Sequence, residues 1–313
     1  FGCAQYILWL GHNKLLEASL KKQDFFVFVK GLFQLMNPRV MSLVIFTCAV
    51  GLLIAPVKIN FVDAVCSLMA VALGSGAAGA LNMWYESDLD SLMTRTCLRP
   101  IPTGKLSKNQ ALAFGILSSL ISIITLYIFS NLVAASLLTI TILFYVFVYT
   151  IWLKRKTSQN IVIGGAAGAL PPVIGWAIAT NGIALEPIIL FLIIFIWTPS
   201  HFWALSLYKS EDYRKAKIPM LPVTSGIKTT KFNILLYAFI LFPVVISPYF
   251  LNFYGLVYLV PAILLSSYYF YISYKLLKER DPIIEKKLAT KLFSYSILFL
   301  FIIFALVLID KII

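Results

Sequence analysis

Apolar runs of membrane-spanning length recur along the whole sequence, and they limit the fold more than any other feature does. The runs are continuous rather than alternating, so they predict helices and not the strands of a membrane barrel. Charged residues or Pro/Gly-marked breaks separate nine of these runs. The predicted spans are Val40–Ala55, Phe61–Leu81, Gln110–Phe129, Leu132–Leu153, Ile161–Thr180, Pro187–Leu207, Phe232–Leu251, Tyr254–Tyr274 and Leu292–Ile309. The first span has an alternative, earlier start, because the preceding segment FFVFVKGLFQLM is also apolar.

The composition agrees with this pattern. Hydrophobic residues make up 60% of the 313 residues, charged residues make up 12%, and the mean hydropathy is +0.91. A soluble protein of this length needs far more polar surface to remain dispersed in water. We therefore expect an all-α polytopic protein with nine transmembrane helices, whose surroundings are the lipid bilayer.

The positive charges lie almost entirely on one side of the predicted topology. The N-terminal segment and the loops after the second, fourth, sixth and eighth spans hold 24 of the 26 Lys/Arg, and only Lys58 and Lys311 lie opposite. Because positively charged loops stay cytoplasmic, we expect the N-terminus and these loops to face the cytoplasm or the mitochondrial matrix. This places the chain in a bacterial plasma (inner) membrane or a mitochondrial inner membrane. The topology accounts for most of the net charge of +13, so no nucleic-acid partner is expected.

Acidic residues are scarce, and two small groups of them follow apolar spans. Only 13 Asp/Glu occur in the whole sequence. Glu86, Asp88 and Asp90 form the first group, and Glu211 and Asp212 form the second. Both groups fall in loops on the positively charged side, so we expect them to converge at one end of the helices.

The first group has a helical spacing. If the second span continues into this segment, Asn82, Glu86 and Asp90 stand at i, i+4 and i+8 and share one helical face. Asp88 then points elsewhere, unless the helix has already ended. Three oxygen-bearing side chains in a row suit a hard divalent ion such as Mg²⁺, which prefers to keep phosphates as additional partners.

Two arginines, Arg95 and Arg99, follow at a spacing of four residues. Arginine binds phosphate oxygens in a bidentate way. Carboxylates and arginines around one point at a membrane surface indicate a metal-bridged, highly anionic substrate with a long apolar tail, such as a prenyl diphosphate. The alternative is a solvated loop whose acids neutralise its own arginines. Just after this segment, Ser107 and Gln110 have the spacing of a helix capping box.

The second group suits a second metal ion, bound by Glu211 and Asp212. The basic residues around it suit diphosphate, although the positive-inside rule also explains them, and for the third and fourth of them it is the favoured explanation. These residues are Lys209, Arg214, Lys215 and Lys217. His201 lies near the end of the sixth span, an uncommon depth for an ionisable side chain. It has two interpretations, a substrate contact or a hydrogen bond to a neighbouring helix.

Together these residues resemble the motifs of a known family, the UbiA superfamily of intramembrane prenyltransferases. Asn82, Glu86 and Asp90 fit its N-D-x-x-D-x-x-x-D pattern, and RTCLRPIPTG resembles the R-T-x-x-R-P-x-x-x-G that follows. Two stretches are similar to one branch, the protoheme IX farnesyltransferases: TSQNIVIGGAAGALPPVIGWA (Thr157–Ala177) and SHFWALSLYKSEDYRKAKIPMLPV (Ser200–Val223).

The resemblance runs from about Gln34 to the C-terminus and includes three departures. Glu86 replaces the usual Asp, Met83 stands where the superfamily pattern has Asp (as is usual for this branch), and Lys217 stands where Gly is expected. The resemblance implies a single transmembrane domain over residues 26–313, with residues 1–25 as a tail outside it. Its nine helices would surround a central cavity capped by the two acidic loops.

The resemblance also implies a reaction. The farnesyl group of farnesyl diphosphate would join a vinyl group of heme B, with addition of water, to give heme O and diphosphate. Mg²⁺, as two ions bridging the diphosphate, would be the cofactor, aided by Arg95 and Arg99. The implied metal ligands are Asn82, Glu86, Asp90 and Asp212. Further contacts to cofactor or substrate would come from Asp88, Lys209, Glu211, His201, Thr157 and Asn160. Heme A synthase or oxidase assembly factors are the implied protein partners.

Two other functions remain open. One is prenylation of a quinone precursor or lipid head group by another enzyme of the superfamily, against which the Thr157–Ala177 stretch argues. The other is transport, since many helices and intramembrane polar groups suit a transporter as well. The repeated hexapeptide GAAGAL, with small residues four apart such as Gly164 and Gly168, is interpreted as helix packing.

Overall fold

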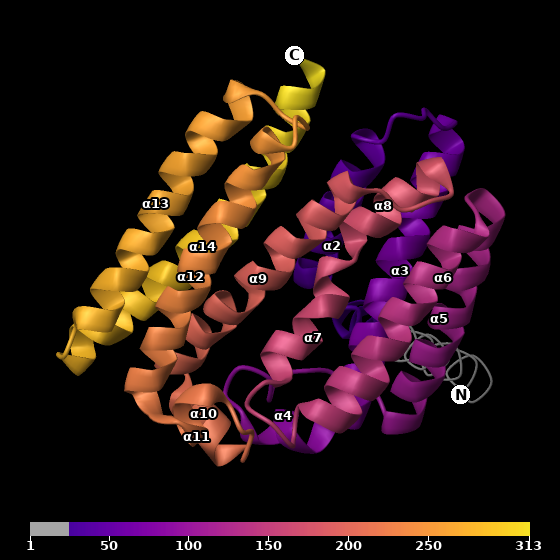
Figure 1. Cartoon of the computed structure of the whole chain (residues 1–313). Helices are drawn as coiled ribbons and strands as arrows, with labels where there is room; N and C mark the ends of the chain where they lie inside the picture. Colours follow the sequence, from indigo (N-terminus) through magenta and orange to yellow (C-terminus); the bar gives the residue numbers. More distant parts are fainter. Residues whose placement is uncertain (1–24) are drawn as a thin grey trace, which may run out of the picture.

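The computed structural model describes residues 25–313, and this part of the chain contains helices and no strand. A first helix over Phe25–Leu35 is followed by the elements labelled in Figure 1. These are α2 (Pro38–Leu53), α3 (Phe61–Tyr85), α4 (Ser87–Leu92), α5 (Lys108–Phe129), α6 (Leu132–Leu143), the π-helix η1 (Phe144–Leu153), α7 (Asn160–Ala169), α8 (Pro171–Thr180), α9 (Leu185–Tyr208), α10 (Ser210–Lys215), α11 (Leu221–Thr224), α12 (Gly226–Phe250), α13 (Leu256–Lys278) and α14 (Pro282–Ile312). The predicted tail over residues 1–25 lies almost entirely outside the described residues.

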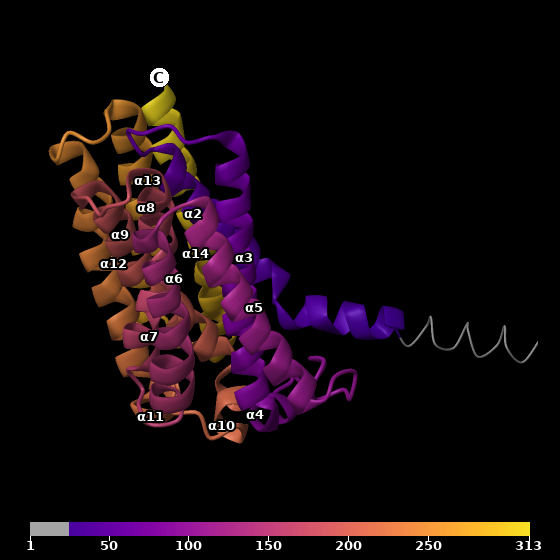
Figure 2. The same cartoon turned by 90° about the vertical axis from the view of Figure 1, so that its right-hand side faces the viewer.

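The predicted spans agree with the helices. Within the described part, eight helical stretches are long and apolar enough to cross a membrane, and a ninth results if the first helix and α2 count as one span bent by 49°. The bend occurs at Asn37, whose backbone is left-handed (φ 50°), a conformation that Asn tolerates better than most residues. Figure 2 shows the first helix leaving the bundle at this point.

The helices pack around two connected cores. One core lies among α9, α12, α13 and α14, and the other among α2, α3, α5, α6 and α8; α2 and α8 contribute to both. Figure 1 shows α12–α14 on one side of the bundle and α3, α5 and α6 on the other. The two helices that join the cores cross closely: a Cβ on Gly51 would overlap the Pro172 carbonyl, and one on Gly175 would overlap the Cys48 carbonyl.

The glycines of the repeated hexapeptide only partly serve helix packing. A Cβ on Gly76 would meet Met36 at 2.8 Å, and one on Gly164 would overlap the ring of Tyr149, so packing is confirmed at these positions. For Gly168 the prediction is wrong, because a Cβ there would meet no heavy atom within 4 Å. Gly168 instead faces an apolar cavity.

The short helices α4, α10 and α11 gather at one end of the bundle, and the C-terminus lies at the other end (Figure 1). On the side of these short helices, α5 begins with the predicted capping box. The Ser107 side chain accepts from the Gln110 amide at 3.2 Å, and the Gln110 side chain accepts from the Ser107 amide at 2.8 Å. This end of the molecule holds both acidic groups.

Candidate active site

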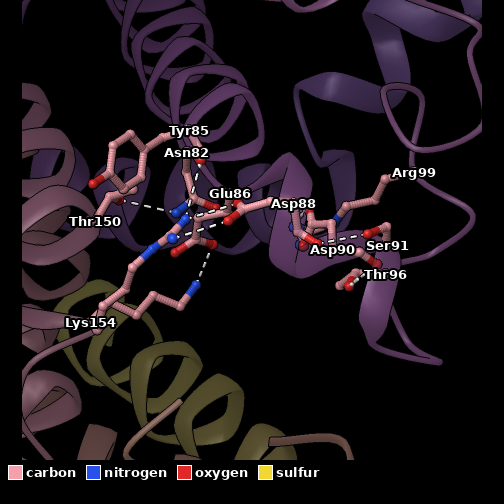
Figure 3. A network of polar contacts seen from close by, with 11 residues as sticks. Asn82, Tyr85, Glu86, Asp88, Asp90, Ser91, Thr96, Arg99, Thr150 and Lys154 are labelled. Carbon is pink, nitrogen blue, oxygen red and sulfur yellow. Dashed lines mark hydrogen bonds and ion pairs between the residues drawn. The ribbon is translucent and has the colours of Figure 1, made fainter. Parts of the chain in front are cut away.

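The first acidic group lies where α3 passes into α4. Glu86 is the residue between the two helices, and the i+4 hydrogen bonding continues through it: its amide donates to Asn82 O and the Asp90 amide donates to Glu86 O, both at 2.9 Å. The side chains of Asn82, Glu86 and Asp90 are all buried. The structure therefore keeps the predicted spacing of these three residues (Figure 3).

Basic side chains pair with the two buried carboxylates. The Arg99 guanidinium donates from Nη1 to both oxygens of Asp90 at 2.8 Å. Lys154, which comes from the end of η1, donates to Glu86 Oε2 in a short ion pair. The other oxygen, Glu86 Oε1, is buried and has no hydrogen-bond partner among the described residues. An unpaired buried carboxylate oxygen is costly, so this atom is suited to an additional cation.

The π-helix η1 places side chains that the sequence analysis missed. Its wider turn lets Thr150 Oγ1 donate to Tyr145 O, five residues back, at 2.8 Å. The same oxygen accepts from Asn82 Nδ2 at 3.0 Å, which ties η1 to α3. Tyr149 then faces the site, and Lys154 reaches Glu86. The signal available in the sequence was a basic residue directly after an aromatic-rich span, but its direction depends on the π register.

These residues line one pocket that encloses about 490 Å³ of empty space. Two carboxylates, Glu86 and Asp90, share it with three cations, Arg95, Arg99 and Lys154. The remaining walls are mostly apolar and aromatic. They are formed by Leu89, Met93, Tyr149, Ile161, Phe202, Tyr213, Ile218 and Met220, with Asn160 as a further polar residue. A pocket with this combination can hold a polyanion beside an apolar group.

Asp88 points away from the pocket, as expected for its position. Its carboxylate accepts from the Arg155 guanidinium at 2.9 and 3.0 Å and is half exposed. Partial burial raises the pKa of Asp88, but the hydrogen bonds and charge of Arg155 and the backbone donors outweigh this, so its pKa lies below the usual value. The structure therefore shows this acid in a surface ion pair rather than beside Glu86 and Asp90.

The second acidic group lies close to the first but is not joined to it. Asp212 Oδ1 accepts from Thr94 Oγ1 at 2.5 Å, and Asp212 Oδ2 is buried without a partner in the described chain. Glu211 is exposed and pairs with Arg214 at 2.8 Å. In residues 25–313 no three His, Cys, Asp or Glu side chains lie close enough together to form a metal-binding group. The first group and Asp212 are thus neighbours through the Thr94 segment.

Two basic residues of this segment lie outside the pocket lining. The ammonium of Lys209 lies 6.0 Å from the ring centroid of Tyr208. Lys217 has a left-handed backbone (φ 53°), a conformation in which Gly carries no steric penalty. This explains why the family pattern has Gly at that position and why Lys217 departs from it.

The remaining predicted contacts differ in their surroundings. His201 is buried between the rings of Trp197 and Phe293, and its Nδ1 lies 2.5 Å from Ser296 Oγ, so the interhelical hydrogen bond is present. It does not line the pocket. Asn160 does line it, and its Nδ2 donates to Thr157 O at 2.5 Å while Oδ1 stays buried without a partner in residues 25–313.

Comparison with known proteins places the chain in a family. The profile of the UbiA prenyltransferase family matches residues 44–308. The chain belongs to this family. A UbiA homolog from Archaeoglobus fulgidus bound to DMAPP and Mg²⁺ has the same fold, with a TM-score of 0.66 at 18% identity over 88% of this chain and 98% of that one. A structure from work on digeranylgeranylglyceryl phosphate synthase matches with a TM-score of 0.76 at 19% identity over 91% and 99% of the two chains.

Curated UbiA relatives are much closer in sequence. The protoheme IX farnesyltransferase of Pelagibacter ubique is 63% identical over 301 residues, which cover 96% of this chain and 99% of that protein. The protoheme IX farnesyltransferase of Afipia carboxidovorans is 53% identical over 87% of each chain. The all-helical UbiA fold and the apolar helices together make this chain an integral membrane protein.

Proposed function

We propose that this chain joins the farnesyl group of farnesyl diphosphate to a vinyl group of heme B, giving heme O and free diphosphate. The observation that carries the proposal is the pocket at the end of α3, where Glu86 and Asp90 are buried beside Arg95, Arg99 and Lys154. The names of the relatives at 63% and 53% identity supply the substrate class.

The donor atoms at the site fit Mg²⁺. Glu86 Oε1 and Asp212 Oδ2 are buried acceptors with no hydrogen-bond partner in the described residues, and hard cations prefer oxygen ligands. We infer that Asn82, Glu86, Asp90 and Asp212 hold the metal, as two ions that bridge the diphosphate. When bound, Mg²⁺ neutralises charge that develops on the leaving phosphate oxygens. A structural neighbour that binds DMAPP with Mg²⁺ supports this assignment.

The chain's own residues then act on the two ends of the substrate. Arg95 and Lys154 line the pocket as cations that stabilise the diphosphate as its bond to farnesyl C1 breaks. Leu89, Met93 and Phe202 line the same space and keep water from the allylic carbocation. The face of Tyr149 is an electron-rich surface beside this cation.

The bond changes balance without an added oxidant. The C–O bond between farnesyl C1 and diphosphate breaks, and the electron pair leaves with the diphosphate. The vinyl double bond of heme B supplies the electrons for the new C–C bond. Water then adds to the carbon left electron-poor and loses a proton, which gives the hydroxyethylfarnesyl group. Asn160, whose Oδ1 is buried without a partner in residues 25–313, and Thr157 beside it are proposed to face the acceptor.

The sidedness of the site follows from charge. We propose that α4, α10 and α11 face the cytoplasm or matrix of a bacterial inner membrane or a mitochondrial inner membrane, because 24 of the 26 Lys/Arg lie on that side. Heme A synthase or oxidase assembly factors would receive the product there.

The product mass tests the proposal. Purified protein in detergent is given farnesyl diphosphate with either heme B or 4-hydroxybenzoate, in the presence of Mg²⁺ or of EDTA. We expect a farnesylated, hydrated heme from heme B with Mg²⁺, and no product with EDTA. Prenylated 4-hydroxybenzoate would instead indicate the quinone-precursor activity, and substrate uptake into vesicles without diphosphate release would indicate a transporter.

A further inference from the structure

A second cavity lies deeper in the bundle than the charged pocket. It encloses about 740 Å³ of empty space between α2, α3, α6, η1, α7 and α8. Its lining is almost entirely apolar or small, and no charged side chain contributes to it. Such a cavity suits a hydrocarbon chain.

The same three elements line both spaces, one above the other. On α3, Ala78 and Gly79 face the deep cavity, and Glu86 follows at the charged pocket. On η1, Tyr145 lines the deep cavity and Tyr149 the charged pocket, with ring centroids 5.3 Å apart. Helix α7 likewise passes from Asn160 at the pocket to the deep cavity. An anionic head in the upper space would therefore place an attached apolar tail in the lower one.

The far end of the deep cavity is closed by the protein core. Val71, Leu138 and Ile174 line this end and are almost completely buried, packed with other residues of one core cluster. Val71 precedes Asn82 by 11 positions on α3, which corresponds to about 16 Å along a helix. A chain that starts at the charged pocket thus meets a wall of large side chains.

Gly168 opens the side of this cavity. It lines the space midway along α7, and a Cβ added to it would meet no heavy atom within 4 Å. A side chain at this position would project into the cavity without displacing a neighbour. Gly74, in contrast, is close to Leu138, because a Cβ there would lie 3.0 Å from Leu138 Cδ1.

We infer that this cavity holds the prenyl chain and that Val71, Leu138 and Ile174 set the longest chain that the enzyme accepts. The inference rests on the proposed function, because it takes the charged pocket as the diphosphate site. It adds a specificity determinant: enlarging the closed end favours a longer chain, and filling the cavity at Gly168 favours a shorter one. Adding or removing a methylene's space in an apolar pocket changes specificity by about 10–200-fold.

The test compares three prenyl diphosphates, with ten, fifteen and twenty carbons. Their equilibrium dissociation constants and the masses of their heme products are measured for the full chain and three variants. For Leu138→Ala we expect the preference for twenty over fifteen carbons to rise about tenfold or more. For Gly168→Leu the preference for ten over fifteen carbons rises by a similar factor. Ile163→Phe, a change on the exposed side of the same helix, should alter neither ratio.

The two readouts separate this inference from the proposed function. Unchanged binding ratios in Gly168→Leu, whose site tolerates a side chain, would overturn the inference even if Leu138→Ala fails to fold. Shifted binding ratios without any prenylated heme would support the inference and refute heme B as the acceptor. Heme O formation with unchanged chain-length ratios in both variants would do the opposite.

Discussion

Around the candidate site, each acid of the first group has a basic partner from elsewhere in the chain. The pairs are Glu86 with Lys154, Asp88 with Arg155 and Asp90 with Arg99. The acids and the partner Arg99 could be predicted from the sequence, because they lie within one short segment with helical spacing. Lys154 could not, because it follows Glu86 by 68 positions and reaches it only through tertiary packing.

Replacing Lys154 tests whether this cation contributes to catalysis. We expect Lys154→Gln to lower kcat/KM for farnesyl diphosphate by about 10²–10³-fold, since a preorganised charge at the leaving group is lost. Lys156→Gln is the matched control, because Lys156 is exposed and does not line the pocket. Steady-state kinetics of diphosphate release measure both. Equal kcat/KM values in the two variants would remove Lys154 from the site.

Lys217 illustrates a residue whose backbone matters more than its side chain. The left-handed conformation costs a non-glycine residue roughly 1–2 kcal/mol. We therefore expect Lys217→Gly to retain activity and to match or exceed the wild-type melting temperature, whereas the β-branched variant Lys217→Val melts lower. Thermal unfolding in detergent gives the order. Loss of diphosphate release in Lys217→Gly would show instead that the ammonium group is used.

At the scale of helices, the sequence predicted the spans well and their interruptions less well. Hydropathy places the spans because each must bury its backbone polar groups in lipid. The capping box at Ser107 was also predictable, since it depends on local side chains. The π-helix η1 was not, because its register depends on contacts such as the one between Thr150 and Asn82 on another helix. Helix α14 extends beyond the predicted Leu292–Ile309 because its first turns are polar.

The crossing of α2 and α8 depends on glycine, and this gives an element-level prediction. Gly175→Ala should destabilise the protein by about 1–3 kcal/mol, because the new Cβ overlaps the Cys48 carbonyl on α2. Gly168→Ala, at a position with free space, should leave the melting temperature unchanged or raise it, since Ala favours helices. Differential thermal unfolding in one detergent compares them. The reverse order would show that this crossing does not limit stability.

The whole molecule has one chemically active end. Both acidic groups, the charged pocket and nearly all basic residues lie at the end that holds α4, α10 and α11. The distribution of basic residues predicted this end from sequence alone. The two stacked cavities could not be predicted, because they depend on which small residues of α3 and α7 meet other helices and which do not.

Cysteine labelling in intact cells tests the membrane orientation. In a background without native cysteines, Lys286→Cys and Lys58→Cys place one exposed thiol at each end of the bundle. We expect an impermeant maleimide to label Lys58→Cys in intact cells and Lys286→Cys only after lysis. Labelling of Lys286→Cys from outside would invert the proposed topology.

The central claim is that buried carboxylates at the junction of α3 and α4 drive release of diphosphate from the prenyl substrate. The most direct measurement is diphosphate release by purified wild type, Asp90→Asn and Asp88→Asn with farnesyl diphosphate, heme B and Mg²⁺. We predict that Asp90→Asn loses about 10²-fold or more in rate, because its carboxylate is buried in the pocket. Asp88→Asn, two positions away in a surface ion pair, should remain within a few-fold of wild type. Equal rates for wild type and Asp90→Asn would contradict the account.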